Sequence, residues 1–381
     1  MDSGQKYVGL FNQNIRLFFK DALRLALRDP AMALFVYRTL RRQKRAEDIR
    51  LSWEERGLHV PPFMIASITK RCNLQCKGCY ARAQHRSAEP EMSADKLRSV
   101  IAEAQELGIS IILLAGGEPL TRPEVLDITR DFPNVIFPLF TNGLLIDEQM
   151  VREFKKQRNL VPVLSLEGHQ VETDRRRGRG VYEHLLEVMK LLHGQGVFFG
   201  ASLTVTRRNF GLVMDEDFIR ELIAAGCRLL FFVDYVPVQP GTDELVLTEE
   251  QRRAESRIVA SFRAELPGLF VAFPGDEEIY GGCLAAGRGF VHLSPEGRLE
   301  PCPFSPFSDS SLENVSLKEA LQSPLLRTIR ENDGQLSETR GGCALWEKRE
   351  WVASLLHPEP APVAAGGGKQ ATARLHTTEL M

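Results

Sequence analysis

The sequence predicts an α/β protein built around a parallel sheet, either an open sheet or a partial barrel. Short β-rich runs recur from residue 60 onward, and helical patterns such as 93–108 and 181–196 separate them. The runs are almost continuously apolar, which is typical of parallel strands covered on both faces. The 381 residues, 43% of them hydrophobic, are enough for a large core. In folds of this class the chemistry collects at the carboxyl ends of the strands.

The chain begins with a basic helical region over residues 10–50. Nine Lys or Arg and two Asp lie between Arg16 and Arg45, and Pro30 should divide the region into two helices. The spacing of the apolar residues suits two interpretations equally. The helices could pack on the main body with their basic faces in water, which we favour. Alternatively, they could attach peripherally to an anionic membrane surface or to an acidic substrate.

Six strands are expected in the central region. The helix over 93–108 is predicted to begin after Ser93 as N-cap and to end at Gly108. After about residue 275 the pattern changes, because 289–302 predicts a hairpin that turns at 295–297. The expected strands are 63–69, 110–117, 135–143, 161–168, 198–206 and 228–236. The expected domains are a basic helical extension (1–57), the barrel (58–275), a small C-terminal α+β domain (276–357) and a disordered, Pro/Gly/Ala-biased tail (358–381).

The composition argues against several classes of protein. A formal net charge of -2 gives no reason to expect nucleic acid as a partner. The first sixty residues have no signal-peptide pattern, and their longest apolar run, 30–37, is far too short to span a bilayer of ~30 Å. The seven cysteines are clustered and odd in number, which argues against a disulfide framework. We therefore expect a protein of the reducing cytoplasm, with peripheral membrane contact through residues 10–50 as the alternative.

A loop with the sequence "RCNLQCKGCY" (71–80) follows the first expected strand. Its cysteines, Cys72, Cys76 and Cys79, can converge on one centre. An iron–sulfur cluster held by three thiolates would leave one iron open to a small ligand. Zinc would need a fourth Cys or His at short range, and the nearest histidine is His85. The spacing favours the cluster, with a zinc knuckle or a structural cysteine group as the alternative.

This loop resembles the cluster-binding loop of the radical S-adenosylmethionine (SAM) enzymes. In that family an aromatic residue precedes the last cysteine. Here Gly78 stands at that position and the aromatic is Tyr80, which we expect beside the adenine of SAM. The resemblance covers residues 60–345 in order, and it implies SAM, a [4Fe-4S] cluster and a partial (β/α)6 barrel of the TIM type. The matching motifs are "GGEP" (116–119), "TNG" (141–143), "SLEG" (165–168) and "LTVTRRN" (203–209).

The resemblance places SAM over these strand ends, and the residue types suit that role. Gly116 and Gly117 let backbone approach a ligand closely, and Glu118 offers an acceptor to the SAM ammonium group. Glu167 stands where the family has Asp. Arg177 best matches the arginine for the SAM carboxylate, although a solvated charge run explains that segment as well. Groups for ribose or carboxylate contacts come from Thr141, Asn142, Ser165 and Thr204, each of which alone could be a simple turn residue.

A second group of cysteines lies toward the C-terminus. Cys283, Gly297 and Cys302 fit C-x13-G-x4-C, which resembles the start of the SPASM or twitch extension found in one branch of the family. Of the dense cysteine run that follows in full-length versions, this chain has Cys343, and Thr339 stands where a further cysteine is expected. The resemblance therefore implies one auxiliary [4Fe-4S] cluster held by Cys283, Cys302 and Cys343.

The fourth ligand of the auxiliary cluster stays open. A substrate atom, water, or the carboxylate of Asp276 or Glu277 could supply it. The alternative is that the three cysteines are unrelated and structural, since free cysteine is often a small buried hydrophobe. We expect Cys227 to lie in the core and His292 to be structural.

By this resemblance the chain is an enzyme. SAM would be cleaved reductively to methionine and a 5′-deoxyadenosyl radical, which would abstract hydrogen from an unactivated carbon of a peptide or protein side chain. A flavodoxin or ferredoxin would supply the electron, and the auxiliary cluster would accept an electron from the product radical or ligate the substrate. A tetrapyrrole or lipid precursor is the alternative substrate. The competing class is a non-catalytic iron–sulfur electron carrier or a zinc-stabilised binding protein, but a carrier would not need the ordered polar strand ends.

Overall fold

A computed structural model describes residues 3–26, 30–84, 87–336 and 343–356. His85, Thr339 and the tail predicted to be disordered (358–381) lie outside these ranges. Within these ranges, no helix has both the length and the apolar character needed to cross a membrane.

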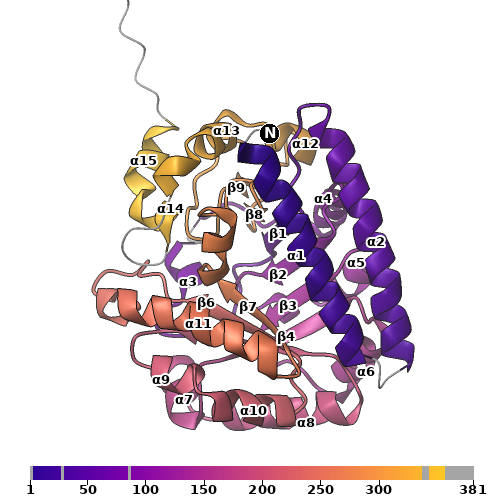
Figure 1. Ribbon diagram of the computed structural model, residues 1–381, viewed down its shortest axis with the longest axis vertical. Coiled ribbons are helices and arrows are strands. Elements are labelled where there is room, and N and C mark those ends of the chain that lie inside the picture. Colours follow the sequence, from indigo (N-terminus) through magenta and orange to yellow (C-terminus); the bar gives the residue numbers. More distant parts are fainter. Residues whose placement is uncertain (1–2, 27–29, 85–86, 337–342, 357–381) are drawn as a thin grey trace, which may run out of the picture.

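A nine-stranded sheet organises the described residues, in the order β7-β6-β5-β4-β3-β2-β1-β8-β9. Neighbouring strands from β7 to β8 are parallel, and β9 pairs antiparallel to β8. The sheet curls into a half-barrel, as Figure 1 shows, and the predicted partial barrel is confirmed. The strands are β1 (Phe63–Ser67), β2 (Ile111–Ala115), β3 (Phe137–Thr141), β4 (Leu160–Leu166), β5 (Gly200–Val205), β6 (Leu229–Asp234), β7 (Leu269–Phe273), β8 (Phe290–Leu293) and β9 (Leu299–Glu300).

Two features of the sheet were not predicted from the sequence. β7 is a five-residue run flanked by Pro267 and Pro274, and it precedes the change of pattern near residue 275. The predicted hairpin over 289–302 is present as β8 and β9, but β8 also pairs in parallel with β1. The C-terminal segment therefore continues the sheet of the barrel.

The helices follow local capping signals. α4 begins after Ser93, whose hydroxyl accepts a hydrogen bond from Lys96 N, and it ends at Gly108 with a φ of 91°. The helices are α1 (Ser3–Ala26), α2 (Pro30–Glu54), α3 (Tyr80–Gln84), α4 (Ala94–Leu107), α5 (Val125–Asp131), α6 (Glu148–Lys156), α7 (Gln170–Arg177), α8 (Val181–Gly194), α9 (Phe210–Val213), α10 (Glu216–Ala224), α11 (Glu249–Glu265), α12 (Leu317–Ala320), α13 (Pro324–Glu331), α14 (Ala344–Glu347) and α15 (Arg349–Ser354). Short 3-10 turns are η1 (Pro119–Thr121), η2 (Asp243–Leu245), η3 (Gly275–Tyr280) and η4 (Asp333–Leu336).

The two faces of the strands explain why the runs are almost continuously apolar. Side chains on the outer face, such as Met64 and Ile112, are fully buried in the core beneath the helices. Side chains on the inner face, such as Phe63, Ile65 and Leu113, line a cavity inside the half-barrel. Both faces are therefore apolar, as expected for a covered parallel sheet.

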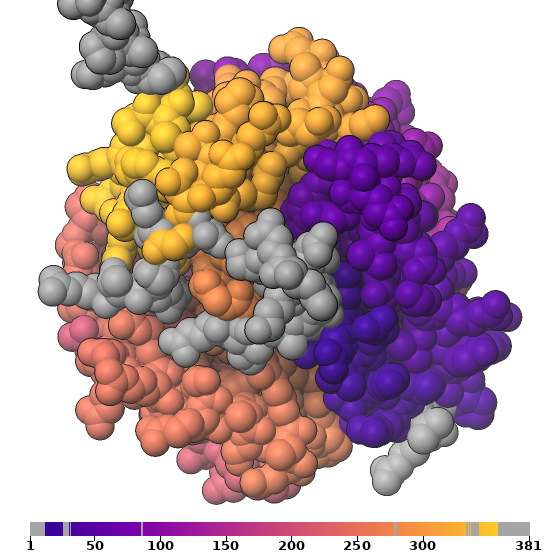
Figure 2. All heavy atoms as spheres, turned by 45° about the horizontal axis from the view of Figure 1, so that its top comes forward, coloured from indigo at the N-terminus to yellow at the C-terminus, as the bar shows by residue number. Residues whose placement is uncertain are grey.

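The N-terminal helices α1 and α2 pack against the inner side of the half-barrel. Ala22 from α1 and Met32 from α2 form one buried cluster with Val161, Leu229 and Leu269 of the strands. Figure 2 shows the two helices (indigo) as one flank of the molecule, with the salmon residues around α11 on the other. The helices thus pack on the main body, which was the interpretation favoured from the sequence.

A buried arginine fixes α2 to the barrel. Arg50 donates from Nη1 to Gly108 O (2.7 Å) and from Nη2 to Asn12 Oδ1 (2.8 Å). Burial lowers the pKa of Arg50 to about 10, although the charge of Glu47 opposes the shift. A Cβ on Gly108 would lie 2.7 Å from the carbonyl oxygen of Ala46, so α2 lies directly on the end of α4.

Candidate active site

The cysteine loop lies between the end of β1 and α3, at one end of the cavity. Cys72 is exposed, and Cys76 and Cys79 are half-buried. Leu74 N donates to Cys72 Sγ at 3.4 Å, and Asn142 Nδ2 lies 4.0 Å from the same sulfur. Burial raises the pKa of the Cys72 and Cys76 thiols. Thiolates at these positions therefore need a positive centre to neutralise them, which is what an iron–sulfur cluster supplies.

The turn after β2 holds this loop in place. Gly117 N donates to Thr69 O (2.7 Å), and Glu118 N donates to Arg71 O (2.7 Å). A Cβ on Gly116 or Gly117 would overlap the backbone of Thr69 or Arg71. The two glycines therefore let this turn approach the start of the cysteine loop closely.

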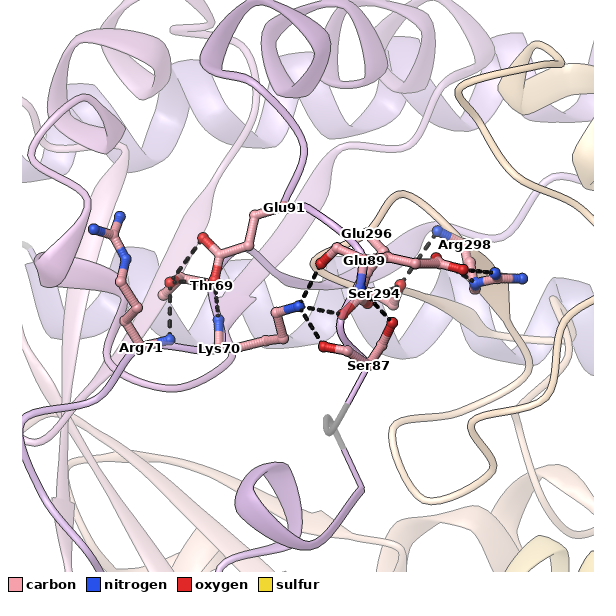
Figure 3. Close-up of polar contacts among 9 residues, drawn as sticks. All are labelled: Thr69, Lys70, Arg71, Ser87, Glu89, Glu91, Ser294, Glu296 and Arg298. Atoms are coloured by element: carbon pink, nitrogen blue, oxygen red, sulfur yellow. Dashed lines mark hydrogen bonds and ion pairs between the residues drawn. The ribbon is translucent and has the colours of Figure 1, made fainter.

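The start of the cysteine loop also forms polar contacts with the C-terminal hairpin (Figure 3). Lys70 Nζ lies 3.1 Å from Glu296 Oε1 and donates to Glu89 O at 2.7 Å. Glu91 accepts from Lys70 N at 2.7 Å, and Arg298 pairs with Glu89 at 2.5 Å. These contacts fix the end of β1 relative to the hairpin between β8 and β9.

Glu118 is buried and connects two of the predicted motifs. Its Oε1 accepts from Leu120 N (3.0 Å) and from the Thr141 hydroxyl (2.8 Å), and its Oε2 accepts from Asn142 N (2.7 Å). Burial raises the pKa of Glu118, and these hydrogen bonds oppose the shift. Glu118 and Thr141, both expected to contact SAM, therefore also bind each other and join the ends of β2 and β3.

A pair of arginines on α7 surrounds Glu167. Arg176 Nη1 lies 2.6 Å from Glu167 Oε2, and Arg177 Nη2 lies 2.6 Å from Oε1. Arg176 also exchanges hydrogen bonds with the backbone of Lys77 in the cysteine loop. Two guanidinium groups on one carboxylate leave a surplus positive charge, and both lower the pKa of Cys76 against the larger effect of burial. Arg176 was not predicted, although it stands in the same "DRRRG" run as Arg177.

The cavity inside the half-barrel has a volume of about 1320 Å³. Pockets for one small ligand usually have about 300–1,000 Å³, so this cavity has room for SAM and a second molecule. Ser165 and Thr204 line it, as does Asn142. Phe18 from α1 and Phe35 from α2 contribute to a wall that is mainly apolar.

Tyr80 lies between the two groups of cysteines. Its ring packs edge-on against Phe304, with centroids 5.2 Å apart, and its hydroxyl is hydrogen-bonded to the Ser67 side chain. Burial raises the pKa of Tyr80, and the charges of Cys79 and Cys302 add to the shift. The ring that was expected beside the adenine is therefore engaged with the C-terminal segment.

A buried hydrogen-bonded chain continues from Tyr80 through β1, β8 and β9. Ser67 Oγ lies 2.8 Å from His292 Nε2, and His292 Nδ1 lies 2.7 Å from Glu300 Oε2. With its proton on Nδ1, His292 donates to Glu300 and accepts from Ser67. Burial lowers the pKa of His292 to about 3, although the charge of Glu296 opposes the shift. These contacts are those of a structural histidine.

The C-terminal cysteines lie near one another. Cys283 and Cys302 are buried, and Cys343 is half-buried just before α14. Burial raises the pKa of Cys283 and Cys302, and the charges of Glu277 and Cys343 raise both further. Cys227 lies apart in the core, as predicted, and burial raises its pKa to about 12.

The described cysteine groups do not have the geometry of a site for a single metal ion. Zinc would require thiolates at about 2.3 Å from one centre, whereas in a cluster each cysteine binds a different iron. Among the described residues, no three His, Cys, Asp or Glu side chains converge as the ligands of a single ion would.

Comparisons with known proteins agree with this arrangement. A family model described as the radical SAM superfamily matches residues 66–209. An AdoMet-dependent heme synthase from Methanosarcina barkeri is 26% identical over 322 residues, which cover 77% of this chain and 91% of that protein. A PqqA peptide cyclase from Granulibacter bethesdensis is 26% identical over 260 residues, which cover 64% of this chain and 68% of that protein.

A solved structure shares the fold. Streptococcus suis SuiB bound to S-adenosylmethionine has a TM-score of 0.61 and 17% sequence identity, over 77% of this chain and 73% of that chain. The family model and the relatives add the sequence similarity that a fold alone does not supply. With the C-x3-C-x2-C loop at the end of β1, these likenesses show that the chain is an enzyme with a radical SAM domain over residues 66–209; proteins of that superfamily use SAM and a [4Fe-4S] cluster.

Proposed function

We propose that this chain holds a [4Fe-4S] cluster through Cys72, Cys76 and Cys79 and binds SAM at the open iron. The cluster would supply the electron that cleaves SAM to methionine and a 5′-deoxyadenosyl radical, and that radical would abstract hydrogen from an unactivated carbon. One observation carries the proposal. Three thiols stand at the end of a cavity large enough for SAM and a substrate, beside the surplus positive charge of Arg176 and Arg177.

The residues of the chain would bind and orient SAM. Arg177 would contact the SAM carboxylate, with Glu167 holding its guanidinium in position. Ser165 and Thr204 would contact the ribose, and Glu118 would accept from the ammonium group while keeping its bond to Thr141. The apolar walls would exclude water from the reacting carbon. The exposed Cys72 side of the loop would face a reducing partner such as flavodoxin or ferredoxin.

We also propose an auxiliary [4Fe-4S] cluster on Cys283, Cys302 and Cys343, with Glu277 as its fourth ligand. Glu277 is buried, and its Oε1 accepts from Leu284 N (3.2 Å), the residue next to Cys283. Its charge acts on both Cys283 and Cys302. Asp276, the other candidate, pairs with Arg263 at 2.6 Å and accepts from a backbone amide. Glu277 is therefore the better placed of the two carboxylates.

The cavity favours a compact substrate with an apolar body, which fits a tetrapyrrole or lipid precursor. A peptide segment inside the cavity would bring many backbone groups into a largely apolar space, where unpaired amides are costly. A peptide or protein side chain that enters from the cysteine end is the second candidate. It is favoured by the similarity to a PqqA peptide cyclase.

Iron and SAM assays test the cofactor proposal. After anaerobic reconstitution we expect about eight irons per chain, whereas about four would remove the auxiliary cluster. SAM and dithionite should then release 5′-deoxyadenosine, and Cys76→Ala should abolish this release. Cys283→Ala should leave some SAM cleavage but stop product formation. A well-loaded protein that releases no 5′-deoxyadenosine would instead support an electron carrier.

A porphyrin titration tests the substrate class. Iron coproporphyrin III is the probe, and binding should shift its Soret band. Ala22→Trp fills the end of the cavity formed by α1 and should remove the shift while the iron content stays unchanged. A wild-type protein that leaves the porphyrin spectrum unchanged would favour the lipid or peptide classes.

A further inference from the structure

The cavity runs the full length of the half-barrel. At the carboxyl ends of the strands its lining includes Ser165 and Thr204, and at the amino ends it includes Val161 of β4 and Leu229 of β6. Strands of five to seven residues, such as β2 and β4, span about 17–23 Å. SAM at the cysteine loop would therefore occupy one end of the cavity and leave the amino-end half for another molecule.

This amino-end half has apolar walls on both sides. We call it the deep half and define it by six residues that line the cavity and belong to one buried cluster. Water in such a space would need about two to four polar partners, so the walls favour an apolar ligand. The six are Ala22, Met32 and Val36 of the N-terminal helices and Val161, Leu229 and Leu269 of the strands.

The shape of the deep half favours a chain over a flat macrocycle. Ala22 of α1 packs in the same buried cluster as Val161 and Leu229, so the helices and strands that form the walls lie against each other there. A four-ring macrocycle would have to separate these walls, and forcing packed apolar groups apart is destabilising. A single hydrocarbon chain needs less width, and it gains favourable transfer from water with each methylene it buries.

A guanidinium group stands at the amino end of the deep half. Arg228 directly precedes Leu229 and lines the cavity. Its Nη1 donates to Ile223 O at 2.6 Å and to Cys227 O at 2.9 Å, which holds the side chain in place. Among the described residues, no carboxylate forms an ion pair with this guanidinium. The charge therefore favours an anionic group on the ligand.

We infer that the deep half binds the hydrocarbon chain of a fatty acid, with the carboxylate at Arg228 and the chain directed along the strands toward the cysteine loop. The apolar walls account for the chain, and the guanidinium accounts for the acid. Carbons far from the carboxylate would then lie nearest to SAM. That such a carbon is the target of the radical rests on the proposed function, whereas the binding of the chain does not.

A chain-length series tests the site. The probes are octanoate, decanoate, dodecanoate and tetradecanoate, each titrated into cluster-loaded protein by isothermal calorimetry. Each buried methylene should tighten binding about fourfold, or about 15-fold from one acid to the next, until the chain fills the cavity. An affinity that does not rise with chain length would overturn the inference.

Two tryptophan variants of α2 test the location. Val36→Trp fills the deep half and should weaken tetradecanoate binding by about tenfold or more. Leu34→Trp is the matched control, because Leu34 is 49% exposed and does not line the cavity; it should bind tetradecanoate like the wild type. Both should load iron and bind SAM like the wild type, because the cysteine loop lies at the other end. Val36→Met, with a smaller and more flexible side chain, repeats the test at less risk to folding and should weaken binding by a smaller factor.

The head group is tested at Arg228. Dodecanol, which lacks the carboxylate, should bind the wild type about tenfold or more weakly than dodecanoate, and Arg228→Gln should bind the two about equally. Arg220→Gln removes a guanidinium of α10 that pairs with Glu216 at 2.6 Å, so it should keep the preference for the acid. A general loss of stability would weaken both ligands alike and leave their ratio unchanged. Tighter binding of dodecyl phosphate than of dodecanoate would assign a phosphate lipid and overturn the carboxylate.

The outcomes separate this inference from the proposed function. If the wild type loads iron and binds SAM but binds no fatty acid, the inference fails and the proposed function stands. If Leu34→Trp loses as much affinity for tetradecanoate as Val36→Trp, the chain does not lie in the deep half. If the wild type gives the expected chain-length series but binds no SAM, the chain site stands and the proposed function fails.

Discussion

His292 lies in the middle of the buried series of hydrogen bonds that joins the two cysteine regions. The stability lost when its side chain is removed follows from the contacts in the structure. His292→Ala deletes the contacts to Ser67 (2.8 Å) and to Glu300 (2.7 Å). A neutral hydrogen bond contributes about 1 kcal/mol, and a hydrogen bond to a charged group, here from neutral His292 to the Glu300 carboxylate, contributes about 1.5–3 kcal/mol. We expect the free energy of unfolding to fall by about 3 kcal/mol.

Urea unfolding of cluster-free, reduced protein measures this loss. His169→Ala is the control, because the Glu221 carboxylate lies 4.0 Å from its Nε2 and the histidine side chain is 44% exposed; the loss should stay below about 1 kcal/mol. Replacing His292 and Glu300 together by leucine should recover much of the stability, since replacing both partners of a buried hydrogen bond by apolar groups can be nearly neutral. A loss below about 1 kcal/mol in His292→Ala, or a double variant no more stable than the single one, would refute the reasoning.

The pH dependence gives an independent check on His292. Burial lowers its pKa to about 3, so below its ordinary value of about 6.5 the unfolded chain binds a proton that the folded chain does not. Stability from this residue is therefore present above pH ~6.5 and lost as the pH falls toward 3, by about 2 kcal/mol between pH 7 and pH 5. His292→Ala should lose this part of the pH dependence. If the free energy of unfolding changes with pH by the same amount in both proteins, His292 is protonated in the folded state.

Three further perturbations test the site and its support. Gly117→Ala places a Cβ against the backbone of Arg71, so the cysteine loop should no longer hold its cluster. Reconstitution should then give only the iron of the auxiliary site, about four per chain; about eight irons would show that the loop tolerates the added Cβ. Arg177→Ala should weaken SAM binding in equilibrium dialysis by about tenfold or more, because a charge-assisted hydrogen bond contributes about 1.5–3 kcal/mol; unchanged affinity would remove Arg177 from the SAM site. Arg50→Ala deletes the buried contact to Gly108 and should lower the free energy of unfolding by about 2–4 kcal/mol; a neutral result in urea would show that α2 does not depend on it.

The half-barrel was predictable because its signal is local. Each predicted strand is a short apolar run between helical patterns, and all six were found near their expected positions. The pairing of β8 with β1 was not predictable, because it joins residues such as Ile65 and His292 that are more than 200 positions apart. A local sequence pattern does not determine which distant strand pairs with the edge of a sheet.

In the candidate site, too, the local pattern could be predicted and the contacts between distant residues could not. The spacing of the cysteines at 72, 76 and 79 is a property of one loop, so it could be recognised in the sequence. The polar strand ends were assigned to SAM, yet Glu118 binds Thr141, and Glu167 binds both Arg176 and Arg177. Buried carboxylates require partners within the protein, and those partners come from other turns. Residue type at a strand end therefore predicts a polar site better than it predicts which atoms are left for a ligand.

One departure from the family pattern can be understood by asking what occupies the affected space. Position 78 lacks its aromatic residue, and Tyr235 from the end of β6 lies where a side chain there would be. Tyr235 comes from a different element and lines the cavity. A group needed at a fixed point in space does not have to come from a fixed point in the chain, so restoring the family residue at position 78 should collide with Tyr235 rather than improve the site.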